Sequence, residues 1–265
     1  MKESSINSIR QIAFIAMTMG VMVIFDLLLL LIAILTLFQA RRLYAEVMVR
    51  GLSQFVLFMA KIRIEEHGRP QSKKAVFYMP NHPSMLDVFM LTALGLPRTR
   101  YFMSSSVWTY VPFAFASWLM GVFFVPDQSR REARVRCFQR AERSLLASGE
   151  SILGTPEGQI NQNGLGPFNR GIFHLATQLG TPIIPICILF PPGAKPKLFF
   201  ARRSTVVRVK FLPEIETKTW KVDDIDFHKE QVREVFQRFI VEHSEAEYTS
   251  SFQTMDNQQT HQESP

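Results

Sequence analysis

Cysteine is scarce in this sequence. The chain of 265 residues contains two cysteines, Cys137 and Cys187, which lie far apart. Cys187 falls within an apolar run that is typical of a buried strand, so we expect both thiols to be buried and free. Two distant cysteines exclude a disulfide framework, and no group of histidines and acidic residues has the spacing of a metal site. The fold is therefore expected to depend on its hydrophobic core, without disulfides, metal ions or other cofactors.

Charged residues are almost absent between Ile12 and Phe38, where Asp26 is the only one. This apolar run is long enough to cross a bilayer with some tilt. Asp26 costs about 3 kcal/mol at the bilayer centre, but each Leu, Ile, Val or Phe contributes roughly 0.5 kcal/mol in the other direction. A cleaved signal peptide is disfavoured because the run is too long and no small-x-small site follows it. We therefore predict a membrane helix over residues 11–38.

No nucleic-acid-binding motif accompanies the basic character of the chain, whose formal net charge is +7 and whose pI is about 9.6. Between Arg41 and Lys74 the sequence has eight Lys or Arg against three Glu, a net charge of +5. A basic segment that directly follows a membrane helix typically binds anionic lipid head groups. Membrane lipids rather than nucleic acid are therefore the predicted partners. The excess of Lys and Arg after the helix places the main domain on the cytoplasmic side of a membrane.

Apolar residues from Leu43 to Ile62 recur at helical spacing on one face. This segment either lies in the membrane interface, packs back on the first helix as a hairpin, or is an ordinary amphipathic core helix. We divide the chain into an N-terminal helical region (1–62), an α/β domain (63–245) and a polar tail (246–265). The tail is rich in Gln and Ser and lacks periodicity, so we expect it to be disordered.

Strand-like and helical segments alternate through residues 63–245. This alternation predicts an α/β fold with a mostly parallel mixed sheet flanked by helices, joined to a membrane-anchoring helix or helical hairpin. The expected strands are Ala75–Met79, Tyr101–Met103, Val122–Val125, Ser151–Leu153, Ile183–Ile188, Lys197–Ala201 and Val206–Phe211. The expected helices are Ser84–Leu94, Arg130–Ser148, Arg170–Leu179 and Phe227–Glu245.

A short motif follows the first of these strands. Asn81-His82-Pro83-Ser84-Met85-Leu86-Asp87 reads N-H-x-x-x-x-D and begins a predicted helix. A histidine at a strand-to-helix junction is partly exposed, and a carboxylate five residues later can reach one of its ring nitrogens. That contact fixes the tautomer and makes the other nitrogen a better general base. Alone, the same pattern also fits a capping histidine and a solvated aspartate.

Three further segments follow in order, namely Gly121-Val122-Phe123-Phe124, Thr155-Pro156-Glu157-Gly158 and Thr181-Pro182-Ile183-Ile184-Pro185. Together with the first motif they resemble the ordered blocks of the glycerolipid acyltransferase family, of which lysophosphatidate acyltransferase is the type. The resemblance covers about Ala75 to Ile188. It implies transfer of a fatty acyl chain from a thioester, either acyl-CoA or acyl-carrier protein, to a hydroxyl of a lysophospholipid or a related single-chain lipid.

The resemblance implies a role for each motif residue. His82 would take the proton from the acceptor hydroxyl, and Asp87 would orient His82. The sequence has no G-x-S-x-G elbow, so an acyl-serine intermediate is not expected. Two alternatives remain open: a catalytically inactive lipid-binding member of the fold, and a hydrolase in which His82 activates water.

Five residues form the predicted substrate-binding set. Glu157 and Gly158 match the block that binds the acceptor lipid; Gly158 permits close backbone approach, and Glu157 either holds a hydroxyl or organises a loop. Arg170 matches a basic position before a glycine and either contacts a phosphate or faces solvent. Asn81, beside His82, and Arg130, at a helix start, complete the set.

The sequence departs from the family where a phosphate monoester is normally bound. Ile160 stands where the family has an arginine, Pro126-Asp127 stands where the family usually has Asp-Arg, and Ser104–Ser106 replaces another basic position. Arg130, Arg131 and Arg134 lie near enough to compensate in part, or they form the solvated face of a helix. We therefore expect lysophosphatidate to be a poor acceptor, compared with a lysolipid that has a diester, amino-acid or sugar head group.

Overall fold

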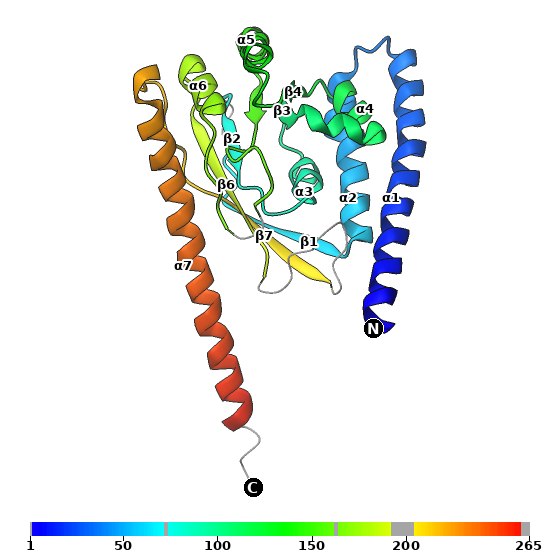
Figure 1. Cartoon of the computed structure of the whole chain (residues 1–265), viewed down its shortest axis with the longest axis vertical. Helices are drawn as coiled ribbons and strands as arrows, with labels where there is room; N and C mark the ends of the chain where they lie inside the picture. Colours follow the sequence, from blue (N-terminus) through cyan, green and yellow to red (C-terminus); the bar gives the residue numbers. More distant parts are fainter. Residues whose placement is uncertain (1, 72–73, 162–163, 192–203, 261–265) are drawn as a thin grey trace.

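A seven-stranded mixed sheet forms the centre of the computed structural model, which describes residues 2–71, 74–161, 164–191 and 204–260 (Figure 1). The strand order is β1-β7-β6-β2-β5-β3-β4, and every neighbouring pair is parallel except β6 with β7. The strands are β1 (Ile62–His67), β2 (Phe77–Pro80), β3 (Thr99–Ser104), β4 (Phe123–Val125), β5 (Ser151–Leu153), β6 (Ile183–Leu189) and β7 (Thr205–Phe211). The predicted α/β class with a mostly parallel mixed sheet is confirmed.

Helices cover both faces of the sheet and create two hydrophobic cores. The first core receives α2 (Arg50–Met59), α3 (Asp87–Ala93), α4 (Val111–Leu119) and part of α1 (Lys2–Leu35). The second receives α5 (Arg131–Ser148), α6 (Arg170–Leu179) and α7 (Ile225–Thr260). Side chains of a strand alternate between faces, so along β2 Tyr78 enters the first core while Phe77 and Met79 enter the second. This double burial explains why β2 and β6 read as continuous apolar runs in the sequence.

The N-terminal helix α1 is part of the folded domain as well as a potential anchor. Ile15–Leu35 is the one stretch in the described residues that is long and apolar enough to cross a membrane by length and composition. Met22, Leu29 and Ala33 are nevertheless almost completely buried in the first core. After a turn, a π-helical segment η1 (Leu43–Val49) leads into α2, which runs back beside α1 (Figure 1). For Leu43 to Ile62 the structure combines two of the alternatives, since α2 runs back beside α1 and also buries its apolar face in the first core, against α3; β1 begins at Ile62.

Sequence and structure differ at three places. Strand β1 is not among the expected strands, because charged residues alternate with its apolar ones. Helix α4 is likewise absent from the expected helices, and the expected strand Lys197–Ala201 lies outside the described residues. The expected irregular tail is instead helical through Thr260, since no proline or glycine interrupts residues 246–260 and a packed helix extends more readily than a new one starts.

Candidate active site

His82 and Asp87 come together at the carboxyl end of β2, the position at which α/β sheets commonly bind ligands. The Nδ1 atom of His82 lies 3.0 Å from Oδ2 of Asp87. The same carboxylate oxygen accepts the backbone N–H of Ser84 at 2.8 Å, which holds it at the start of the following turn. With Nδ1 engaged by the carboxylate, Nε2 is the ring nitrogen that can exchange a proton with a substrate. The geometry matches the pairing that the motif predicts.

Burial sets the electrostatics of this pair. The side chain of Asp87 is 0% exposed, whereas that of His82 is 22% exposed. Burial raises the pKa of Asp87 above its ordinary value, and the hydrogen bonds from His82 and Ser84 oppose that shift. The carboxylate therefore depends on the imidazole for much of its stabilisation, so the two groups act as a unit.

Glu157 organises the loop after β5. Its side chain is buried, and Oε1 accepts the backbone N–H of His82 at 2.9 Å. Oε2 accepts the side-chain amide of Asn161 at 2.6 Å and the backbone N–H of Gly166 at 2.7 Å. The backbone N–H of Asn161 in turn donates to the carbonyl of His82 at 2.9 Å. Of the two roles considered for Glu157, the structure supports the organisation of a loop, because its oxygens already have protein partners.

Asn81 is not brought to the substrate space. Its side-chain amide donates to the carbonyl of Ile188 at 3.2 Å, and its Oδ1 accepts the backbone N–H of Ile188 at 2.7 Å. This pair of bonds joins the ends of β2 and β6 and engages both the nitrogen and the oxygen of the amide. The predicted substrate-binding role of Asn81 is therefore replaced by a structural one, in which it fixes the chain just before His82.

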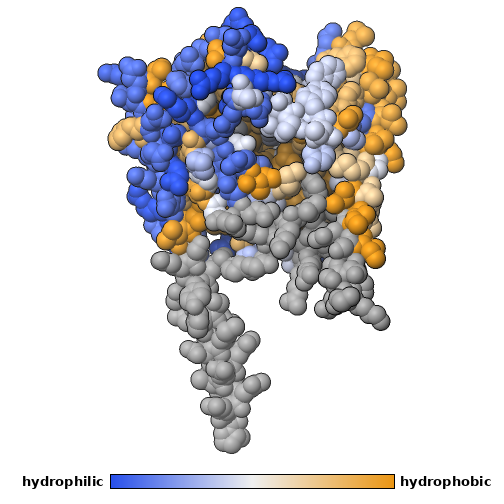
Figure 2. Space-filling view, in the orientation of Figure 1, coloured by the Kyte–Doolittle hydropathy of each residue, from blue (hydrophilic) through white to orange (hydrophobic). Residues whose placement is uncertain are grey.

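A cavity of about 680 Å³ opens in front of His82. Figure 2 shows a hollow in this face of the molecule, with mainly hydrophilic surface on one side and apolar surface on the other. One part of the lining is apolar and comes from four elements: Met19 and Met22 of α1, Phe89 of α3, Met103 of β3 and Phe113 of α4. This part has the chemistry to hold a hydrocarbon chain.

The other part of the lining is polar. It includes Asp127, Gln128, Arg134, Gln159 and Asn169, which lie on the segments after β4 and β5 and at the start of α5 and α6. Arg134 also donates from Nη1 to the carbonyl of Pro126 at 2.9 Å. The cavity thus combines an apolar compartment, a polar mouth and a histidine–aspartate pair.

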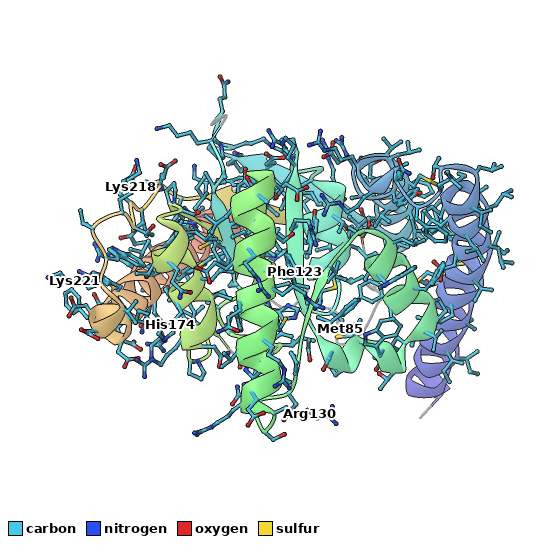
Figure 3. All side chains as sticks on the ribbon, turned by 90° about the horizontal axis from the view of Figure 1, so that it is seen from above. Met85, Phe123, Arg130, His174, Lys218 and Lys221 are labelled. Carbon is cyan, nitrogen blue, oxygen red and sulfur yellow. The ribbon has the colours of Figure 1, made fainter. Side chains whose placement is uncertain are left out.

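Of the three remaining predicted binding residues, one lines the cavity and two do not. Gly158 lines the cavity with a φ of +66°, and a Cβ there would lie 2.8 Å from the Asn169 side chain. Arg170 does not line the cavity; it is about half exposed and pairs with Asp226 on α7 at 3.4 Å. Arg130 is also outside the lining, at the N-terminal end of α5 (Figure 3). Of the three arginines expected near this position, Arg134, one turn farther along, is the one that lines the cavity.

Sequence reasoning did not anticipate that α1 contributes to the cavity, because an apolar run that fits a bilayer gives no sign that one of its faces lines a substrate site. It also missed Asn161 and Asn169, which hold the loop after β5. Asn169 donates to the carbonyl of Glu157 at 2.7 Å. An asparagine in a polar loop carries no motif signal, so only the folded loop identifies it.

Comparison with known proteins points to a single family. The family model described as Acyltransferase matches residues 61–189. The chain is similar to the 1-acyl-sn-glycerol-3-phosphate acyltransferase of Limnanthes alba, with 30% identity over 184 residues. That match spans 69% of this chain and 65% of the relative, just under two thirds of its length. The alpha form of the Bos taurus enzyme is 29% identical over 182 residues, which span 67% of this chain and 63% of that protein.

The crystal structure of PlsC, the 1-acyl-sn-glycerophosphate acyltransferase from Thermotoga maritima, has the same fold. It aligns with a TM-score of 0.68 and covers 89% of this chain and 96% of that chain. The sequence identity of this pair is 15%, so the likeness supports the fold alone.

Proposed function

Because this chain belongs to the glycerolipid acyltransferase family, we propose that it transfers a fatty acyl group from an acyl thioester to a hydroxyl of a single-chain lipid. The observation that carries this proposal is the His82–Asp87 pair at the mouth of a cavity that is apolar on one side and polar on the other. The donor is acyl-CoA or acyl-carrier protein, and no metal ion or other cofactor takes part. The acceptor is a lysophospholipid or a related lysolipid.

The geometry supports direct attack by the acceptor. Asp87 holds the Nδ1–H tautomer of His82, so Nε2 carries the lone pair that accepts the hydroxyl proton. The hydroxyl oxygen forms a bond to the thioester carbonyl carbon, and the carbon–sulfur bond then breaks. The proton held on Nε2 passes to the departing thiolate, which leaves as a thiol. The apolar compartment holds an acyl chain while the polar mouth holds a head group.

Product analysis tests this proposal. Purified protein in detergent is incubated with isotopically labelled palmitoyl-CoA, or with palmitoyl-carrier protein, and a panel of lysolipids. The expected product is a two-chain lipid with the label in the new ester. Release of free fatty acid instead would identify a hydrolase, and absence of turnover with either donor and every acceptor would identify an inactive lipid-binding protein.

Asp87→Asn is expected to reduce the rate of acyl transfer less than removal of the histidine ring does. The asparagine amide oxygen can still accept the Nδ1–H of His82, but the negative charge that stabilises the protonated ring is lost. We expect a fall of about one to two orders of magnitude, within the range of general-base contributions. Initial rates at saturating acceptor measure it, and an unchanged rate would contradict the positioning role of Asp87.

We also propose that the protein is attached to a membrane with its catalytic domain on the cytoplasmic side. Large apolar side chains are exposed on the outer face of α1, at the α1–α2 turn and on α4, and Figure 2 shows the resulting apolar flank. They include Ile24, Leu28, Leu31, Phe38 and Trp118. An exposed apolar surface of this extent fits a lipid environment better than water.

Replacement of Ile24, Leu28 and Leu31 with glutamine is expected to shift the protein from the membrane fraction toward the soluble fraction. These side chains are 71%, 49% and 54% exposed, so the change removes apolar surface from the outer face and leaves the core intact. Ultracentrifugation of lysates measures the partition. Val222→Gln, at an exposed apolar position outside α1, is the matched control and should not change it.

A further inference from the structure

The charges that face the cavity are few and nearly balanced. Arg134 is the only Lys or Arg among the described residues that line it. The acidic residues in that lining are Asp87, which is paired with His82, and Asp127, at the polar mouth. The mouth therefore presents one guanidinium and one carboxylate to a head group.

Asp127 lies between β4 and α5, with its side chain open to the cavity mouth. Its Oδ1 accepts the backbone N–H of Ser129 at 2.9 Å, and the Ser129 side chain also hydrogen-bonds to the carboxylate. These hydrogen bonds and the nearby Arg134 and Arg130 hold the pKa of Asp127 below its usual value, so the carboxylate is charged at neutral pH. A charged carboxylate at this place repels a phosphate monoester and attracts an ammonium group.

The rest of the mouth does not supply the positive charge that a phosphate monoester requires. Ile160 lines the cavity and has no hydrogen-bond donor in its side chain. Ser104 and Ser106 also line it, but they are uncharged and their hydroxyls bond to each other at 2.9 Å. A dianionic head group is normally held by several charge-assisted bonds, and this mouth offers one arginine.

We propose that the acceptor head group carries an ammonium group, bound by Asp127, and a single negative charge, bound by Arg134. This inference rests on the proposed acyl transfer and specifies its substrate class. The shared chemistry occurs in a lysophospholipid with an aminoalkyl phosphodiester and in a single-chain lipid whose head is a diamino acid. Asp127 is the residue that determines specificity.

A comparison of initial rates among acceptors tests the proposed head-group specificity. Initial rates of acyl transfer are compared for four single-chain acceptors: lysophosphatidylethanolamine, lysophosphatidylglycerol, lysophosphatidate, and a diamino acid N-acylated with a 3-hydroxy fatty acid. The ethanolamine and glycerol lipids share a phosphodiester and differ in the ammonium group. We expect an ammonium-bearing acceptor to be used about five- to tenfold faster than the glycerol lipid, and lysophosphatidate to be slowest. The faster of the two ammonium-bearing lipids tells whether a phosphodiester or a carboxylate supplies the negative charge.

Asp127→Asn isolates the charge, because the asparagine Oδ1 can still accept the Ser129 N–H and preserve the turn. In this variant the ratio of the initial rate with an ammonium-bearing acceptor to the rate with the glycerol lipid should fall to about one. The rate with lysophosphatidate, relative to the rate with the glycerol lipid, should rise. Glu132→Gln removes an equal charge from α5 at a side chain that is 90% exposed and outside the lining, so the preference should be unchanged.

Equal or faster transfer to the glycerol lipid or to lysophosphatidate by the native protein would overturn the assignment. So would a preference that Asp127→Asn leaves intact. Either result keeps the proposed acyl transfer, because an acylated product still forms. No acylated product with any of the four acceptors would overturn the proposed function and the assignment together.

Discussion

His82→Ala is expected to lower the rate of acyl transfer by about two to four orders of magnitude. The change removes the ring that we propose as the acceptor of the hydroxyl proton, while the cavity and the polar mouth remain in place. The loss should therefore appear mainly in kcat, with a much smaller change in KM for either substrate. Initial-rate kinetics with one donor and the preferred acceptor measure both constants.

The same substitution is expected to affect stability only modestly. The hydrogen bonds of the His82 backbone to Glu157 and Asn161 do not involve the ring. Asp87 loses one partner but keeps the Ser84 N–H, so we expect a loss of about 1–3 kcal/mol. His174→Ala, on α6 and outside the cavity lining, is the matched control for loss of an imidazole (Figure 3). Activity of His82→Ala within threefold of the native protein would show that another group is the base.

Glu157→Gln is expected to lower both stability and activity, although glutamine has nearly the same shape. The two carboxylate oxygens of Glu157 accept three N–H donors, from His82, Asn161 and Gly166. A glutamine places an NH2 group where one oxygen was, so donors then face donors in a buried site. We expect a loss of roughly 2–4 kcal/mol, because buried donors are left without acceptors.

Thermal unfolding and kinetics together distinguish the loop-organising role of Glu157 from a role in substrate binding. A loss of that size corresponds to a fall in Tm of about 5–10 °C for a domain of this length. Activity should also fall, since Glu157 holds the backbone that carries His82. Asn161→Ala, which removes only one of the three donors, should give a smaller drop in Tm. If Glu157→Gln instead raised KM for the acceptor without changing Tm, Glu157 would be a substrate ligand.

Apolar runs predicted the central strands well. Strand β5 has the predicted bounds and β2, β3, β4, β6 and β7 differ by a few residues. The signal is clearest for β2, β5 and β6, because these strands are buried on both faces and must be apolar throughout. Edge strand β1 has charged residues on its exposed face, so its sequence resembles a polar loop. Residues 246–260 were expected to be a disordered tail and are helical for a related reason. Their polar composition shows that they have no core of their own, but it does not show that the packed helix α7 continues into them.

The N-H-x-x-x-x-D motif by itself determined the candidate catalytic pair, His82 and Asp87. A histidine and an aspartate five residues apart at a strand-to-helix junction are close in sequence, so local geometry alone brings them within hydrogen-bonding distance. The apolar run of α1 and the absence of cationic residues at Ile160 and Ser104–Ser106 are likewise properties of the sequence itself. The alternation of strand-like and helical segments determined the fold class, and the ordered motif blocks determined the family resemblance and the candidate base.

Only the tertiary structure decided what the other polar residues do. Asn81 precedes His82 in the sequence, and Glu157 belongs to another motif of the same family pattern. The Asn81 side chain nevertheless hydrogen-bonds to Ile188, and the Glu157 side chain hydrogen-bonds to the loop after β5. Met22 reaches the cavity from a helix that the sequence reads as a membrane anchor. These contacts join residues distant in the chain, and their partners are backbone groups or apolar side chains that carry no motif. Side-chain pattern specifies local geometry, whereas the identity of a distant partner is set only when the strands and helices pack.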